Sequence, residues 1–295
     1  MKHIRKAVLP VAGMGTRFLP ATKSVPKEML PLIDRPLIQY AIDEAREAGV
    51  EEFLLVTAAG KGALEDYFDT AFALEHRLRA AGKRDALDSL MPTRLPEGTV
   101  SFLRQNNPLG LGHAVRLARR FVGNEAFAVL LPDDVIRARR GALSQMVEAH
   151  AAQRGHMVAT MDVPQAKVSA YGVLDVSEVS GRHLRARGIV EKPRPEQAPS
   201  RDAVIGRYIL EPSIFDQLDR IGPGAGGELQ LTDALAADLP QTPLTGFRFD
   251  GERFDCGSVQ GFVQATAAFA LDRPELRTDF GTFLENRMQP SDLVA

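Results

Sequence analysis

The sequence predicts an α/β protein with a doubly wound, mostly parallel sheet and a smaller α+β portion in its second half. Three observations support this fold class. A strand, helix and strand follow one another at the N-terminus, a buried strand near residue 130 ends in two acidic residues, and short β-like runs replace the alternating pattern after residue 153. The 295 residues are enough for one large domain or about two average ones.

The first 57 residues predict one strand–helix–strand unit. Residues 6–11 (KAVLPV) form an apolar run that opens into the glycine loop 12–15, as a buried strand followed by a loop would. Residues 36–48 carry apolar side chains at helical spacing, with a proline at the start and Gly49 as the stop signal. Residues 52–57 (EFLLVT) predict the second strand, so parallel pairing and a right-handed crossover are expected.

The next segment, 58–98, is longer than a single crossover and has helical spacing in its first part. After this segment the pattern returns to alternating strands and helices, and Asp133 and Asp134 follow the strand expected over 126–131. We expect a strand over 99–103, a helix over 111–121, a strand over 126–131 and a helix over 141–153.

The second half predicts shorter strands and then helices. The glycine-rich run 222–227 predicts a loop that precedes a helix. The predicted strands cover 156–162, 171–176, 184–190 and 204–210, and the predicted helices cover 228–239 and 259–271.

Composition excludes several function classes. Lys plus Arg number 36 and Asp plus Glu number 38, so the net charge of −2 offers no broad basic field for nucleic acid. No apolar run approaches the about 20 residues that cross a bilayer, and the basic N-terminus precedes an apolar stretch too short for a signal peptide. The single cysteine, Cys256, cannot form an internal disulfide. We therefore expect a cytoplasmic protein without membrane or nucleic-acid partners.

The strongest local motif is the glycine loop with its neighbouring cations. A glycine loop after a strand exposes backbone N–H groups to phosphate oxygens, and Arg17 and Lys27 can add charge-assisted contacts. The loop has no Gly-Lys-Ser/Thr, which excludes a Walker A loop, and Phe18 stands where a dinucleotide fingerprint has its third glycine. The alternative for this motif alone is a tight turn with solvated cations.

The glycine loop (AGMGTR, residues 12–17) and the segment around Lys27 (PKEMLP, residues 26–31) resemble the signature of sugar-1-phosphate nucleotidylyltransferases, and especially of their bacterial uridylyltransferase members. The likeness covers roughly residues 4 to 270 and continues through further motifs in the family's order. These are RQ at 104–105, GLGHA at 110–114, LPDD at 131–134, AYGV at 170–173, VEKP at 190–193, IGRY at 205–208, GELQLTD at 227–233 and FDCG at 254–257.

The resemblance implies a Rossmann-like nucleotidyltransferase core within a single domain, 1–295. It divides this domain into a nucleotide-binding half 1–153, a sugar-binding half 154–257 and a C-terminal helical segment 258–295. The implied nucleotide-binding residues are Ala12, Gly13, Gly15, Thr16, Arg17, Lys27, Gln105 and Gly110. The implied sugar-binding residues are Tyr171, Gly172, Glu191, Lys192 and Val204. Glu191 and Lys192 can both face one pocket only if the chain bends there, which the prolines that follow make credible.

Two aspartates are the expected ligands of Mg²⁺, which binds proteins through one or two carboxylates and completes its shell with substrate phosphates. The resemblance assigns this role to Asp133 and Asp255 and leaves Asp134 a supporting role behind them. Taken singly, each acid has the alternative of a capping or turn residue.

The implied reaction is uridylyl transfer from UTP to α-D-glucose 1-phosphate, giving pyrophosphate and UDP-glucose, a polysaccharide precursor. A phosphate monoester with a second pKa of about 6 is already largely dianionic near neutral pH, so the attack needs no general base. Catalysis then requires positioning and charge neutralisation, for which Arg17, Lys27 and Lys192 are the candidate catalytic cations. His113 is expected to be a packed histidine, and Cys256 a small buried side chain.

Two alternatives remain open. One is a thymidylyltransferase of the same fold, although the long segment 58–98 favours the uridylyl branch. The other is a non-catalytic regulatory paralogue that binds a nucleotide sugar. The resemblance also implies a homodimer or homotetramer.

Overall fold

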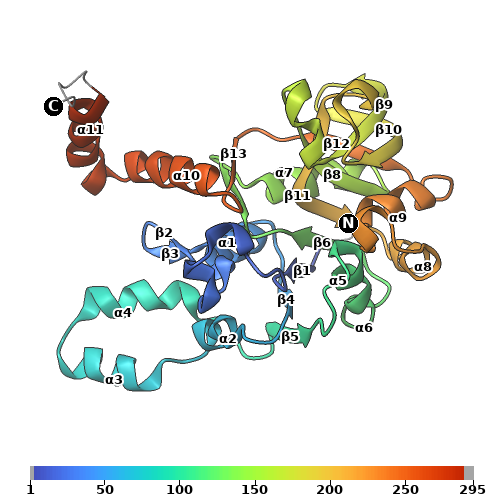
Figure 1. Ribbon diagram of the computed structural model, residues 1–295. Coiled ribbons are helices and arrows are strands. Elements are labelled where there is room, and N and C mark those ends of the chain that lie inside the picture. Colours follow the sequence, from blue (N-terminus) through green and yellow to red (C-terminus); the bar gives the residue numbers. More distant parts are fainter. Residues whose placement is uncertain (1–2, 289–295) are drawn as a thin grey trace.

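The computed structural model describes residues 3–288 and confirms the predicted α/β class (Figure 1). Within those residues the main sheet has nine strands, in the order β5-β4-β1-β6-β11-β8-β12-β10-β9. Its strands are β1 (Lys6–Pro10), β4 (Glu52–Thr57), β5 (Val100–Arg104), β6 (Phe127–Leu130), β8 (His156–Asp162), β9 (Gly172–Ser180), β10 (His183–Glu191), β11 (Asp202–Leu210) and β12 (Leu244–Arg248).

Strand direction changes between the two halves of the sheet. β5, β4, β1 and β6 are mutually parallel, as the strand–helix–strand pattern predicts. β11 then lies antiparallel to both β6 and β8, and β10 lies antiparallel to β12 and β9, whereas β12 and β8 are parallel. Parallel pairing therefore predominates in the first half of the chain, and the second half joins the same sheet with mixed directions. Four of the eight neighbouring pairings are antiparallel, so the sheet is mixed and not mostly parallel as predicted.

Helices cover both faces of the sheet, which makes it doubly wound. Alternate residues of β1 point to opposite faces. Ala7 and Leu9 pack with α1 (Leu37–Glu47) and α7 (Ala142–Ala152). Val8 packs on the other face, with α5 (Leu111–Leu117), α8 (Ile214–Arg220) and α9 (Leu231–Asp238). Because both faces are covered, the strand is apolar throughout rather than alternating.

Two helical segments extend from this body in Figure 1. The long segment after β4 forms α2 (Gly62–Phe68), α3 (Phe72–Ala80) and α4 (Arg84–Leu90). The described part of the chain ends in α10 (Val259–Asp272) and α11 (Pro274–Met288), which leads away from the sheet. α6 (Arg119–Val122) follows α5 directly. No helix in the described part of the chain is long and apolar enough to cross a membrane.

Some predicted boundaries were wrong. The expected helix over 228–239 begins only at Leu231, because residues 228–230 are extended and Leu229 pairs with residues 109–112 at the start of α5. Leu229 N donates to Leu109 O at 2.8 Å, and Gly112 N donates to Leu229 O at 2.8 Å. The elements α8, β12 and β13 (Glu252–Asp255) were not predicted, because their short apolar runs have no clear period.

A two-stranded ribbon brings the distant acids together. β13 pairs antiparallel with β7 (Asp134–Arg137), which places Asp255 directly opposite Asp134. A second small ribbon pairs β2 (Pro31–Leu32) with β3 (Arg35–Pro36). The carboxyl ends of β1 and β6 lead into the glycine loop and Asp133 respectively, so this edge of the sheet carries the candidate site.

Candidate active site

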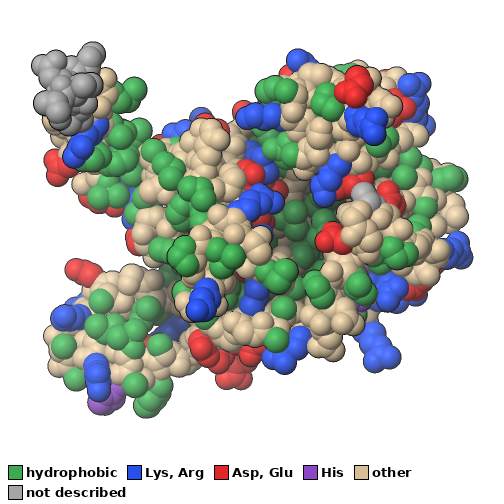
Figure 2. All heavy atoms as spheres, viewed as in Figure 1, with side chains coloured by type: hydrophobic (Ala, Val, Ile, Leu, Met, Phe, Trp, Pro, Cys, Tyr) green, Lys and Arg blue, Asp and Glu red, His purple; other side chains and the backbone are tan. Residues whose placement is uncertain are grey.

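Two cavities open side by side at the carboxyl edge of the parallel strands. The first cavity has a volume of about 320 Å³ and the second about 270 Å³, and they share Leu111, Leu131, Asp133 and Glu228 in their walls. Figure 2 shows a hollow in the middle of this face, with charged side chains of both signs around it. The first cavity contains the predicted residues Arg17, Asp133, Tyr171, Gly172, Glu191, Lys192, Val204 and Asp255. The second contains Ala12, Gly13, Lys27, Gln105, Gly110 and Asp133.

The glycine loop is placed over Lys27. Gly15 has a φ of 66°, and a Cβ there would lie 3.1 Å from Lys27 Cβ, so glycine suits both the conformation and the close approach. Thr22 Oγ1 donates to Gly15 O at 2.7 Å and fixes the turn. Gly15 and Thr16 themselves line neither cavity, although both were predicted to bind nucleotide.

Lys27 forms an ion pair with Asp133. Its Nζ lies 2.5 Å from Asp133 Oδ2, and both side chains are about four-fifths buried. Burial by itself would lower the pKa of Lys27, but the attraction of Asp133 and Glu28 outweighs it and raises that pKa. Burial would raise the pKa of Asp133, but Lys27 lowers it. Both groups are therefore charged at neutral pH.

A second buried ion pair lies next to Lys27 and was not predicted. Lys61 Nζ lies 2.8 Å from Glu28 Oε2, and Glu28 is 1% exposed. Burial raises the pKa of Glu28 and lowers that of Lys61. This pair anchors the short helical turn Lys27–Met29 to the loop after β4. The motif PKEML contains Glu28, but nothing in the sequence indicates its partner.

Asp133 and Asp255 face a common point. A Cβ built on Gly257 would lie 2.7 Å from Asp133 Oδ2 and 3.0 Å from Asp255 Oδ1, so only a glycine leaves this space between the two carboxylates open. Cys256 N donates to Asp133 O at 2.7 Å and ties the two segments together. Arg17 approaches the same point, since its Nη1 donates to Gly257 O at 3.1 Å and lies 4.0 Å from Asp255 Oδ2.

This geometry fits a divalent cation held by two carboxylates. Hard oxygen ligands suit Mg²⁺, and the space beside Gly257 gives both oxygens access to one ion. Residues 3–288 contain no group of three or more His, Cys, Asp or Glu side chains placed to hold a metal. Substrate phosphates would therefore have to complete the coordination shell.

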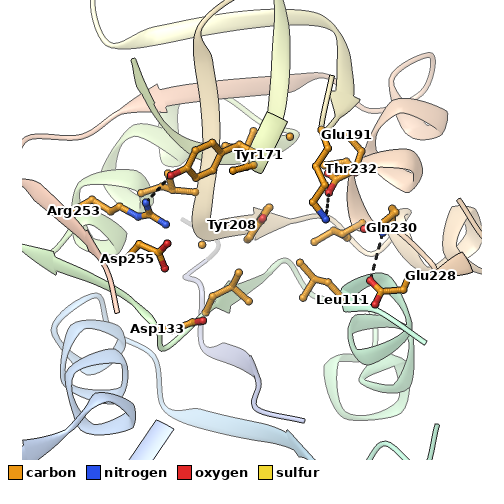
Figure 3. A pocket seen from close by; sticks show the side chains of 18 of the residues that line it. Leu111, Asp133, Tyr171, Glu191, Tyr208, Glu228, Gln230, Thr232, Arg253 and Asp255 are labelled. Carbon is orange, nitrogen blue, oxygen red and sulfur yellow. Dashed lines mark hydrogen bonds and ion pairs between the residues drawn. The ribbon is translucent and has the colours of Figure 1, made fainter. Parts of the chain in front are cut away.

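The wall of the first cavity depends on a bend at Lys192. This residue has a φ of 46°, a left-handed conformation that is costly for a lysine. Lys192 N donates to Tyr171 O at 2.9 Å and holds the bend, so Glu191 and Lys192 both line the first cavity, as predicted. Thr232 Oγ1 donates to Glu191 Oε2 at 2.9 Å (Figure 3). A Cβ on Gly172 would lie 2.6 Å from Thr232 Cγ2, which explains the glycine.

Gln105 contributes an uncharged polar side chain to the second cavity. Its Nε2 donates to Gly110 O at 3.2 Å and to His113 Nδ1 at 2.8 Å. Burial, and then Arg116, lower the pKa of His113, which favours the neutral acceptor. His113 thus lies in a packed position and orients Gln105. Gly110 has a φ of 95°, and a Cβ there would lie 2.7 Å from Glu228 Cβ.

Several residues in the cavity walls received no role from the sequence. These are Tyr208, Glu228, Gln230, Thr232 and Arg253 (Figure 3). Three of them lie in the motif GELQLTD, which signalled the family without indicating a contact, and Arg253 lies just before the motif FDCG.

The site and fold define a nucleotidyl transferase. The family model described as "Nucleotidyl transferase" matches residues 6–271, and the chain belongs to that family. Among curated proteins it is similar to the UTP–glucose-1-phosphate uridylyltransferase of Komagataeibacter xylinus, with 50% identity over 88% of this chain and 91% of the relative. A UTP–glucose-1-phosphate uridylyltransferase of Bacillus subtilis (strain 168) is 41% identical over 99% of this chain and 100% of its own.

Among solved structures the chain is similar to UDP-glucose pyrophosphorylases. A UDP-glucose pyrophosphorylase complexed with UDP-glucose is 42% identical, with a TM-score of 0.84, over 92% of this chain and 100% of that chain. A UTP-bound UGPase from Acinetobacter baumannii is 40% identical, with a TM-score of 0.88, over 96% and 99%. A putative glucose-1-phosphate thymidylyltransferase from Bacillus anthracis is 22% identical, with a TM-score of 0.69 over 90% and 94%, and shares the fold.

Proposed function

We propose that this chain transfers the uridylyl group of UTP to α-D-glucose 1-phosphate and releases pyrophosphate. The observation that carries the proposal is the meeting of the two cavities at Asp133. One cavity offers Gln105 and Lys27 to a nucleotide, and the other offers Glu191 and Lys192 to a sugar phosphate. The names of relatives at 41–50% identity support UTP and glucose 1-phosphate as the pair.

The chain's contribution to the chemistry is positioning and charge neutralisation. An oxygen of the sugar phosphate attacks the α-phosphorus, and the bond from that phosphorus to the β-phosphate oxygen breaks as pyrophosphate leaves. Lys192 is proposed to hold the attacking phosphate, while Arg17 and Lys27 neutralise the triphosphate. Glu191 accepts hydrogen bonds from sugar hydroxyls, oriented by Thr232. Because the attacking oxygen is already ionised, no side chain has to remove a proton.

The remaining contacts follow from cavity position. Gln105 and Gly110 are proposed to read the base, and Ala12 and Gly13 to approach the nucleotide with their backbone. Tyr171, Gly172 and Val204 are proposed to line the sugar subsite. Gly15 and Thr16 are proposed to act through the shape of the loop, since neither lines a cavity.

Magnesium is the proposed cofactor, with Asp133 and Asp255 as its protein ligands. When bound, the ion would neutralise phosphate charge and polarise the phosphoryl group. The position of both carboxylates around the space beside Gly257 supports this assignment.

Three broader expectations are also proposals. The first is that the single domain 1–295 comprises a nucleotide-binding half (1–153), a sugar-binding half (154–257) and a C-terminal helical segment (258–295), whose last seven residues lie outside the described part. A cytoplasmic location is supported by the lone cysteine. A homodimer or homotetramer is supported by the exposed apolar side chains of the terminal helices, such as Val263 and Phe283.

A coupled pyrophosphate-release assay tests the function. The enzyme is given glucose 1-phosphate and Mg²⁺ with UTP, dTTP, CTP, GTP or ATP in parallel. The proposal predicts the highest kcat/KM for UTP. A preference for dTTP would favour the thymidylyltransferase alternative, and no turnover with any triphosphate would favour the non-catalytic paralogue.

A further inference from the structure

Arg253 is a charged residue that lines the first cavity and has no role in the reaction proposed above. It lies on β13, two residues before Asp255, and its side chain is 10% exposed. Its Nε donates to Asp134 Oδ1 at 2.6 Å, and its Nη1 donates to Tyr171 Oη at 3.0 Å. Figure 3 places its guanidinium between Tyr171 and Asp255. The side chain of Arg253 therefore connects the two-stranded ribbon of β7 and β13 to Tyr171 in the wall of the proposed sugar subsite.

Asp134 is the carboxylate that this arrangement holds in place. It follows Asp133 in the chain and lies opposite Asp255 in the ribbon, so its backbone neighbours both expected metal ligands. The two oxygens of Asp134 have different partners, since Arg253 binds Oδ1 and Gly206 N donates to Oδ2 at 2.9 Å. A Cβ on Gly206 would lie 2.4 Å from Oδ2, so that glycine admits the contact. Asp134 is thus turned away from the point that Asp133 and Asp255 face.

The contact between Arg253 and Asp134 limits the number of carboxylates that can reach a metal ion. A third free carboxylate beside Asp133 and Asp255 would complete an all-protein site that binds a divalent cation without substrate. With Asp134 bound by Arg253, the described residues offer the ion two carboxylates, and no three-acid group is present among them. A cation held by two carboxylates keeps positions for the phosphates of the incoming nucleotide.

We propose that Arg253 is a positioning residue that withholds Asp134 from the metal and connects the metal site to the sugar subsite through Tyr171. This inference rests on the proposed nucleotidyl transfer and adds a role for a residue that contacts neither reacting phosphate. Removal of the guanidinium frees Asp134 to join the metal. It also leaves the Tyr171 hydroxyl without its donor, so the sugar wall loses its position.

Mn²⁺ binding to the whole protein without substrates is the direct test, because it does not depend on turnover. Electron paramagnetic resonance gives the Kd, and water-proton relaxation gives the number of waters on the ion. Arg253→Met is expected to bind Mn²⁺ about tenfold more tightly than the unaltered protein, with fewer waters on the ion. Arg253→Lys keeps the charge beside Asp134, so its Mn²⁺ affinity and water number are expected to stay unchanged. Adding Asp134→Asn to Arg253→Met is expected to reverse both changes.

Steady-state kinetics with glucose 1-phosphate test the connection between Arg253 and the sugar subsite. Arg253→Lys cannot reach both Asp134 and Tyr171, and Tyr171→Phe lacks the hydroxyl, so both are expected to raise the KM for glucose 1-phosphate about fivefold to tenfold. The KM for UTP should change little.

The matched control is Arg137→Met on the paired strand β7, because Arg137 is exposed and ion-paired with Glu252 at 3.2 Å, outside both cavities. This control is expected to match the unaltered protein in every measurement.

Two outcomes would overturn the proposal. One is Mn²⁺ affinity and water number in Arg253→Met equal to those of the unaltered protein. The other is an unchanged KM for glucose 1-phosphate in both Arg253→Lys and Tyr171→Phe. If Arg253→Met does not fold, Arg253→Lys and Tyr171→Phe still test the connection to the sugar subsite. Asp134→Asn then tests the metal part, because the proposal requires this variant to keep the number of waters that Mn²⁺ has in the unaltered protein. Failure of uridylyl transfer itself would be seen in the unaltered protein and is thus distinguishable.

Discussion

Lys27 Nζ lies 2.5 Å from Asp133 Oδ2, so a cation expected to hold phosphate is paired with a carboxylate expected to hold metal. Asp133 lies at the point where the two cavities meet. The pair neutralises both groups within a mostly buried region, where an unpaired charge would be costly. A divalent cation on Asp133 would compete with Lys27 for this oxygen and direct the ammonium toward the triphosphate.

Lys27→Met is predicted to lower kcat roughly 10²-fold to 10³-fold, because a preorganised cation beside the transferring phosphate is lost. Pyrophosphate release at saturating UTP and Mg²⁺ measures the effect. The matched control is Lys23→Met, an exposed lysine four residues earlier that lines neither cavity, and its kcat should stay within about twofold. Equal losses in the two variants would mean that Lys27 has no specific role.

The strained backbone at Lys192 predicts a conflict between stability and function. Lys192→Ala and Lys192→Gly both remove the charge, so both should lower kcat/KM for glucose 1-phosphate by about 10²-fold. Only glycine relieves the left-handed conformation at φ 46°. Urea unfolding should therefore find the glycine variant more stable than the alanine variant by about 1 kcal/mol. Equal stabilities would contradict the assigned strain.

A buried polar network predicts acid sensitivity far from the site. Asp238 is fully buried, and burial would raise its pKa, but hydrogen bonds from His156, Ser213 and other donors lower that pKa below its ordinary value. Because the folded pKa is depressed, this stabilisation is present above the unfolded pKa of about 3.9 and is lost as pH falls toward the folded value. Asp238→Asn should cost roughly 1–3 kcal/mol at pH 7.

Urea unfolding of both proteins between pH 7 and pH 3 checks this account. The unaltered protein should lose stability more steeply below about pH 4 than Asp238→Asn does. Parallel curves for the two proteins would exclude Asp238 as a source of the acid sensitivity.

Cys256 is predicted to be unreactive in the folded protein. The thiol is fully buried, and burial, followed by the nearby Asp255 charge, raises its pKa to about 12. At pH 8 a thiol-specific disulfide reagent should therefore label the chain only after urea unfolding. Because the folded pKa lies above the ordinary one, stability should also fall as pH rises above about 9. Rapid labelling of the folded protein would contradict this burial.

The hydrophobic periodicity of the first half of the sequence predicted most of the helices and strands there. The alternation of buried strands and amphipathic helices up to residue 153 predicted β1, α1, β4, β6 and α7 within about two residues of their ends. The short β13 has no such period, and its place beside β7 depends on pairing across more than 100 residues. Local sequence contains no record of such long-range pairing.

The same limit applies to the site. Gly15 could be singled out because it lies in a glycine loop after a strand, and Gly110 and Gly172 because they lie in motifs that resemble those of the family. The partners of buried charges could not, since Glu28 pairs with Lys61 and Arg253 pairs with Asp134 only after the chain has folded. Sequence thus located the motifs, and tertiary structure supplied the contacts between them.

Mn²⁺ binding in the presence of UTP tests most directly whether Asp133 and Asp255 share one metal ion. Electron paramagnetic resonance titrations of the unaltered protein, Asp133→Asn and Asp255→Asn would be compared, with circular dichroism to confirm folding. Each single substitution is predicted to raise the Mn²⁺ Kd at least about tenfold and to reduce pyrophosphate release to background. A folded variant of either aspartate that binds Mn²⁺ and turns over like the unaltered protein would contradict the shared site.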